Sequence, residues 1–253
     1  MSLLSLVTDE YEYRARLRPA LLVSMPLALA AVSWFPGLSG MQVLAGFVTY
    51  CGFTGLLAQL GRDQGKKKEP WLFEYWGGKP TTQLLRHRSS LLDENTKKRY
   101  HAALNSLVPD ITLPTAKEEE EDHGSADTKY DSCVRFLRQK TYDKKMFPLV
   151  FAENVNYGFR RNLWGMRPAG IGLSIVAVSA SILAAIINTV EGAPPVVASV
   201  ATVINGFMLV WWCLRINTEW IRIPAFGYAE RLLSSCDALR PAESSTSSHI
   251  ITP

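Results

Sequence analysis

The basic residues between positions 76 and 88 form the stretch whose types and spacing most suggest chemistry. It contains two glycines followed by Lys79, and it continues through Arg86 and Arg88. The Gly-Gly-Lys triplet invites comparison with the phosphate loop of nucleotide hydrolases. That loop needs Gly at position 73 and Ser or Thr at position 80, where this chain has Phe73 and Pro80. Nucleotide hydrolysis is therefore not predicted, but a helix start flanked by three cations predicts a site for an anion.

Aromatic and basic residues extend this candidate site on both sides. Trp76 closes an aromatic cluster that begins at Trp71, and Arg160 and Arg161 form a second basic pair before the third apolar block. One interpretation is a membrane-interface belt, anchored to lipid headgroups by the lysines at 66–68. The other is a pocket in which aromatic rings stack on a base while cations hold phosphate. The candidate anion-binding residues are Lys79, Arg86, Arg88, Trp76, Arg160 and Arg161.

Catalytic and metal-binding groups are not apparent. The four Cys and four His residues are scattered, without the spacing of a metal site or a disulfide framework. The acidic run at 118–122 is typical of a solvated linker or a helix start, because a cation loop would interleave Gly and Asn. We therefore expect no metal, no cofactor and no catalytic residue.

Four apolar blocks organise the rest of the chain. They run from Pro19 to Phe35, Met41 to Leu60, Pro168 to Thr189 and Pro195 to Ile216. Each approaches the roughly 20 residues that a helix needs to cross a bilayer. They contain no Asp, Glu or His, which argues against a proton-coupled transporter or an intramembrane protease. The connections at 36–40 and 190–194 carry no Lys or Arg, so the positive-inside rule places both termini and the central segment in the cytoplasm.

The predicted fold is an all-α integral membrane protein in which two transmembrane hairpins, four spans in all, flank a cytoplasmic helical domain. We expect Pro80–Thr82 to begin a helix capped by a threonine. We also expect the fourth apolar helix to run on through Arg222 until Pro224 ends it. The expected segments are an interfacial helix over 1–18, the first hairpin over 19–60, a basic helical domain over 61–167, the second hairpin over 168–216, a helix over 217–240 and a disordered tail over 241–253.

Small and polar residues mark faces of the apolar blocks. The second block carries Gly46, Gly52 and Thr49, which permit close helix contacts. Packing within the hairpin is the simpler interpretation, and contact with another subunit or the lining of a pore is the alternative. A buried amide in hydrocarbon is costly, so Asn205 should face protein or water. The candidate pore or packing residues are Asn205, Thr49, Ser181 and Asn188.

Two segments resemble an uncharacterised family of bacterial four-helix inner-membrane proteins. They are WGGKPTTQLLRH, from Trp76 to His87, and FAENVNYGFRRNLWG, from Phe151 to Gly165. The layout also resembles membrane effectors of anti-phage defence systems, a likeness of layout that carries over no residue.

These resemblances imply an oligomeric effector or channel of the bacterial inner membrane. An anionic, nucleotide-like ligand or a partner at the cytoplasmic domain would gate it, and it would act by permeabilising the membrane. The alternative is a non-conducting scaffold that holds a cytoplasmic protein partner. The expected partners are the lipid bilayer, further copies of the chain, a nucleotide or oligonucleotide signal and a cytoplasmic protein.

Overall fold

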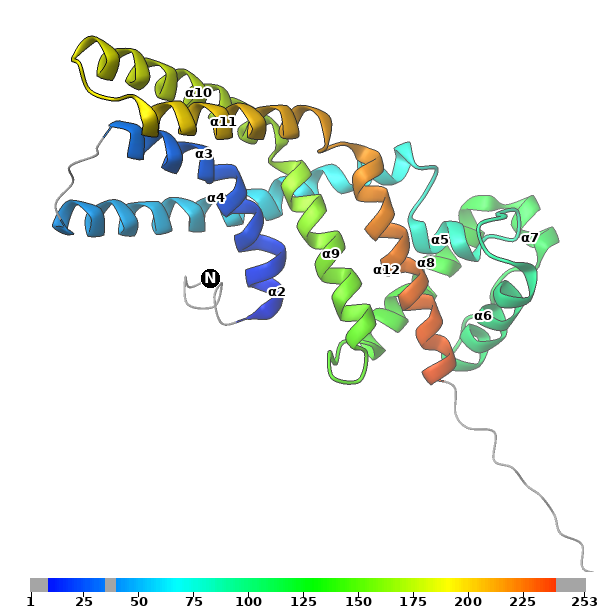
Figure 1. Ribbon diagram of the computed structural model, residues 1–253. Helices are drawn as coiled ribbons and strands as arrows, with labels where there is room; N and C mark the ends of the chain where they lie inside the picture. Colours follow the sequence, from blue (N-terminus) through cyan, green and yellow to red (C-terminus); the bar gives the residue numbers. More distant parts are fainter. Residues whose placement is uncertain (1–8, 35–39, 240–253) are drawn as a thin grey trace, which may run out of the picture. The chain divides into compact units, whose positions relative to one another are not determined.

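The computed structural model describes residues 9–34 and 40–239; the regular secondary structure there is helical, and no strand occurs. Figure 1 shows the helices. The expected disordered tail and the turn at 35–39 lie outside the described residues. The elements are α2 (Glu10–Glu12), the π-helical turn η1 (Tyr13–Leu17), α3 (Arg18–Trp34), α4 (Gly40–Tyr75), α5 (Pro80–Leu85), α6 (Glu94–Leu107), α7 (Ala116–Glu121), α8 (His123–Lys140), α9 (Pro148–Gly165), α10 (Arg167–Val190), α11 (Val196–Leu214) and α12 (Thr218–Leu239).

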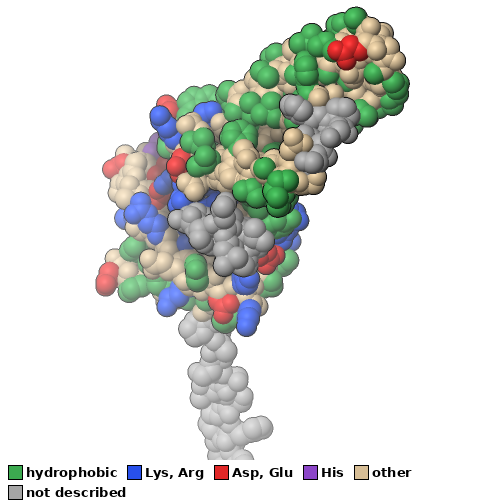
Figure 2. Space-filling view, turned by 90° about the vertical axis from the view of Figure 1, so that its left-hand side faces the viewer, with side chains coloured by type: hydrophobic (Ala, Val, Ile, Leu, Met, Phe, Trp, Pro, Cys, Tyr) green, Lys and Arg blue, Asp and Glu red, His purple; other side chains and the backbone are tan. Residues whose placement is uncertain are grey.

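Four helical stretches of the described residues are long and apolar enough to cross a membrane. They are Glu10–Trp34, Gly40–Leu85, Arg167–Val190 and Val196–Leu214. The prediction of an all-helical protein with four apolar spans is confirmed at this level. Figure 2 shows, on the face that it presents, hydrophobic side chains gathered apart from most of the charged ones.

The described chain divides into two compact units. The first unit runs to Gly78 and includes Phe151–Tyr228, and the second unit holds Lys79–Val150 and α12 from Ala229 onward. The expected basic domain over 61–167 is therefore shared between them. Close packing of α4 on α9 explains the division, because a Cβ on Gly165 would lie 2.6 Å from the backbone nitrogen of Gly65.

Helix α3 is the centre of the first unit, where it packs against α10, α11 and α4 (Figure 1). Small and hydroxyl residues bring these helices close together. Ser24 Oγ donates to Tyr50 Oη at 3.0 Å and lies 3.5 Å from Thr54 Oγ1. Trp34 Nε1 donates to the carbonyl of Ala180 at 3.1 Å, which joins α3 to α10.

Helix α4 is longer than its apolar block. It continues through Pro70 to Tyr75, although proline removes a backbone donor from a helix. Its residues from Gly40 to Thr49 are all exposed within the described structure. A Cβ on Gly46 or Gly52 would meet nothing within 4 Å. These two glycines therefore give no support to the interpretation that the small residues of the second apolar block pack within the first hairpin.

Two helix boundaries differ from the prediction. Helix α12 runs through Pro224, so the prediction that this proline ends a helix is wrong. The chain breaks earlier instead, between the end of α11 at Leu214 and the start of α12 at Thr218, where Asn217 Oδ1 accepts from the N–H of Trp220 at 2.9 Å. A side-chain cap at that point satisfies a free helix donor.

The second unit packs α5 against α6 and α8, and α7 against α8. Its buried apolar side chains include Leu85 of α5, Leu104 of α6 and Leu137 of α8, all fully buried. This small core holds α5 and the N-terminal half of α8 side by side, which places the polar residues described next.

Candidate functional site

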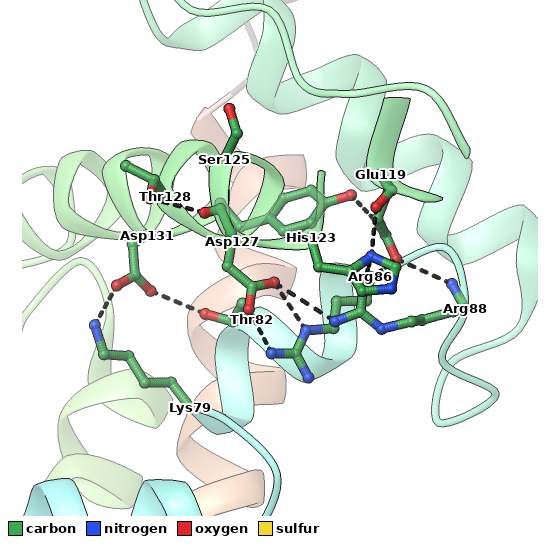
Figure 3. Close-up of polar contacts among 12 residues, drawn as sticks. Lys79, Thr82, Arg86, Arg88, Glu119, His123, Ser125, Asp127, Thr128 and Asp131 are labelled. Atoms are coloured by element: carbon green, nitrogen blue, oxygen red, sulfur yellow. Dashed lines mark hydrogen bonds and ion pairs between the residues drawn. The ribbon is translucent and has the colours of Figure 1, made fainter. Parts of the chain in front are cut away.

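Lys79 opens a polar cluster in the second unit (Figure 3). It occupies the N-cap position of α5, and its ammonium forms an ion pair with Asp131 of α8. Thr82 Oγ1 donates to the other carboxylate oxygen of Asp131 at 2.9 Å. No side chain caps α5, so the prediction of a threonine cap is wrong. The hydroxyl of Thr82 binds α8 instead.

Arg86 binds Asp127 with two parallel hydrogen bonds. Its Nε donates to Oδ1 at 2.9 Å and its Nη2 donates to Oδ2 at 2.5 Å. The hydrogen bond to Asp127 is the main reason that the pKa of Arg86 is raised. Asp127 and Asp131 lie one turn apart on α8, so a single helix face supplies the carboxylates for both cations.

Glu119 is the most buried acid of the cluster, with 2% of its side chain exposed. Its Oε2 accepts from Tyr130 Oη at 2.7 Å and from the N–H of His87 at 2.8 Å. Its Oε1 accepts from Arg88 Nη1 at 3.0 Å and from the Arg88 N–H at 3.3 Å. Burial raises the pKa of Glu119, but these hydrogen bonds outweigh it and hold the pKa below its ordinary value.

A buried lysine fixes the loop that carries these donors. The Lys97 side chain is 1% exposed, and its Nζ donates to the carbonyls of His87 at 3.1 Å and Ser89 at 2.7 Å. His101 lies beneath the same loop, with its Nε2 2.7 Å from the carbonyl of Leu85 and its ring centroid 4.6 Å from that of His87. Desolvation lowers the pKa of His101.

The cluster is balanced in charge. Lys79, Arg86 and Arg88 each face a carboxylate, so an anion would compete with these carboxylates for the three cations. The sequence prediction found the three cations and missed their partners, Asp131, Asp127 and Glu119. The spacing of the two aspartates on one helix face was a detectable signal. Glu119 lay within the acidic run, and nothing in the sequence marked it as the buried member.

The remaining predicted anion-binding residues, Trp76, Arg160 and Arg161, belong to the first unit. Trp76 is buried in its apolar core. Arg160 lies over the ring of Trp220, 4.8 Å from its centroid, and donates to the Trp220 carbonyl at 2.8 Å. Arg161 is 8% exposed and forms an ion pair with Glu69 at 2.9 Å. Each of these two arginines is thus held by its own unit.

The predicted pore or packing residues occupy different environments. Asn205 is fully buried, and its Nδ2 lies 3.4 Å from Ser181 Oγ across the α10–α11 contact. Thr49 is exposed and donates to the carbonyl of Ala45 in its own helix at 2.9 Å. Asn188 is half-buried near the end of α10, where its carbonyl accepts from the Ala193 N–H at 2.8 Å.

Within the described ranges, no three His, Cys, Asp or Glu residues are grouped to hold a metal ion. Comparison of the chain with protein-family models, with curated proteins and with solved structures finds no match. The functional argument therefore rests on the chain's own helices and on the polar cluster.

Proposed function

We propose that the chain is an oligomeric effector or channel of the bacterial inner membrane, with both termini in the cytoplasm. Copies of the chain associate through α4, and the second unit controls the assembly by binding an anionic ligand or a partner. The observation that carries the proposal is the isolation of α4. Its residues from Gly40 to Thr49 are exposed, and a Cβ on Gly46 or Gly52 would meet nothing within 4 Å among the described residues.

The exposed part of α4 has two different sides. A helix advances by about 100° per residue, so small and polar residues gather within about 60° of Thr49. Leu44 and Phe47 lie on the opposite side. Lipid would cover the bulky side, whereas the small side suits close contact with another helix. The small side carries Gln42, Ala45, Gly46, Thr49 and Gly52.

The second unit supplies the proposed control. Its polar cluster begins at Lys79, shortly after α4 ends at Tyr75. Arg86 already presents two donors in the geometry that suits a carboxylate or a phosphate. A phosphate that displaced Asp127 would release α8 from α5. We infer that this exchange of partners is how a nucleotide-like ligand would act on the assembly.

Substitution of the α4 glycines tests the assembly. Gly46→Leu and Gly52→Leu add bulk where a Cβ meets no described residue within 4 Å, so each monomer should fold normally. Both variants should shift the protein toward monomers in lipid nanodiscs. Gly172→Leu is the matched control, because a Cβ there also meets nothing within 4 Å. Equal oligomeric states for all three variants and the wild type would remove the support for association through α4.

A substitution of Asp127 tests whether an anion binds at Arg86 and so regulates the assembly. Asp127→Asn removes the charge that competes for Arg86, so the variant should bind pyrophosphate more tightly than the wild type in calorimetry. Glu121→Gln is the control, because this exposed residue makes the same change in charge outside the cluster. Equal affinities of Asp127→Asn and the wild type would contradict an anion site at Arg86.

A non-conducting scaffold is the second candidate, and the charge balance of the polar cluster favours it. A unit whose three cations are satisfied by its own carboxylates has no need of a ligand to be stable. Ion flux from liposomes separates the two functions. The effector predicts flux that depends on an anion or partner, whereas the scaffold predicts no flux and a stable complex with a cytoplasmic protein.

A further inference from the structure

A second group of cations lies in the first unit, at the polar end of two membrane helices. Arg62 and Lys66 belong to α4, Arg16 to η1 and Arg161 to α9. Arg62, Arg161 and Arg16 repel the Lys66 ammonium, and Glu69 attracts it. All four cations belong to the compact unit that also holds the apolar spans.

Helix registers explain why these residues gather. Ser24 of α3 lies opposite Thr54 of α4, with hydroxyl oxygens 3.5 Å apart. Arg16 lies eight residues before Ser24, and Arg62 lies eight residues after Thr54. Because the two helices are antiparallel, the two arginines lie at the same height along the helix pair. On the other side of α4, a Cβ on Gly65 would lie 2.7 Å from Asn162 Oδ1. Lys66 follows Gly65 on α4 and Arg161 precedes Asn162 on α9, so these two cations also lie at the same height along their helices.

The group carries an excess of positive charge. Arg16 pairs with Glu12, and Arg161 pairs with Glu69. Within the described ranges, neither Arg62 nor Lys66 has a carboxylate at ion-pair distance. The Nε of Arg62 is buried and has no hydrogen-bond partner among the described residues. A buried donor without a partner costs free energy, so this position favours an added acceptor.

The position of the group identifies the kind of acceptor. The apolar block of α4 ends at Leu60, two residues before Arg62, and the apolar block of α3 begins directly after Arg18. Lipid phosphates lie at this level, where the hydrocarbon of a bilayer ends. Leu56 and Leu60 are 62% and 55% exposed on α4, which leaves apolar surface for acyl chains.

We propose that Arg62 and Lys66, with Arg16 and Arg161 beside them, bind the phosphate of an anionic phospholipid. The lipid supplies an acceptor for the Arg62 guanidinium, and its negative charge relieves the repulsion on Lys66. The π-helical turn at Tyr13–Leu17 carries Arg16, and turns of this kind are frequent at functional sites. This site is independent of the polar cluster in the second unit.

The test is the thermal stability of the full-length protein in phosphatidylcholine nanodiscs with and without phosphatidylglycerol. The wild type should melt at a higher temperature when phosphatidylglycerol is present. Lys66→Gln and Arg62→Gln should lose most of this rise, with the apparent lipid affinity weakened about fivefold by each lost cation. Lys67→Gln, an exposed neighbour on the same helix, should keep the wild-type rise.

Two comparisons make the result decisive. In phosphatidylcholine alone, Lys66→Gln should be at least as stable as the wild type, because the substitution removes repulsion; this excludes misfolding as the cause of a lost response. Soluble glycerol phosphate should not reproduce the rise, since it brings no acyl chains. The proposal is overturned if Lys66→Gln and Arg62→Gln respond to phosphatidylglycerol as Lys67→Gln does. It is also overturned if glycerol phosphate stabilises the protein as strongly as the lipid.

Discussion

Replacement of Glu119 by Gln should open the second unit locally. Glutamine keeps the size of the side chain but turns one acceptor oxygen into an N–H₂ donor. Each Glu119 oxygen accepts two hydrogen bonds, one pair from Arg88 and the other from Tyr130 and the His87 N–H. Whichever way the amide turns, two donors lose their acceptor.

The magnitude follows from these contacts. A hydrogen bond to a charged group contributes about 1.5–3 kcal/mol. Arg88 is 37% exposed, so water replaces part of what its guanidinium loses. Tyr130 is fully buried and has no such compensation. We expect the variant to lose about 3 kcal/mol of local stability, which corresponds to roughly 100-fold faster exchange of protected amides.

Hydrogen exchange of the full-length protein in detergent measures this change. The amides of α7, of α8 around Tyr130 and of the loop at 86–89 should exchange faster, whereas those of α10 and α11 should not change. Glu121→Gln is the matched control, since the Glu121 side chain is 66% exposed and its carboxylate is 3.9 Å from Lys117. The role assigned to Glu119 is refuted if both variants exchange at the same rate as the wild type.

Two further predictions concern packing and pH. Gly165→Ala should destabilise the α4–α9 contact by about 1–3 kcal/mol, because its Cβ would lie 2.6 Å from the Gly65 nitrogen; Gly172→Ala, in open space, should stabilise by about 0.5–1 kcal/mol. Thermal melts of both variants in one detergent check this pair, and equal shifts contradict the close contact. Burial lowers the pKa of His101, so its contribution to stability is present above about pH 6.5 and is lost as the pH falls through its folded pKa. A melting series from pH 7.5 to 5 should show the loss, and His101→Gln should flatten it.

The four helices that are long and apolar enough to cross a membrane were predictable, because each depends on a long run of apolar residues. The packing of α10 was also partly predictable, since a Cβ on Gly170 would lie 2.5 Å from the Trp212 ring and Ser174 is fully buried. Whether a small residue meets a helix of its own chain was not predictable. Gly46 and Gly170 look alike in sequence, yet among the described residues a Cβ on Gly170 would meet Trp212 and one on Gly46 would meet nothing within 4 Å.

The three cations of the polar cluster were predictable from the sequence, but the carboxylates that pair with them were not. Lys79, Arg86 and Arg88 are close in sequence, whereas their partners come from α7 and α8. Those pairs form only when the core of the second unit places α8 against α5, which is a tertiary effect. Pro224 shows the same limit, because α12 continues through a residue that local preference would place at a helix end.

The most direct test of the central proposal is native mass spectrometry of the wild type released from lipid nanodiscs, alongside Gly46→Leu and Gly172→Leu. The account predicts a discrete assembly of several chains for the wild type and for Gly172→Leu, and a shift to monomers for Gly46→Leu. A single chain in every sample, with and without nucleotides, would contradict it.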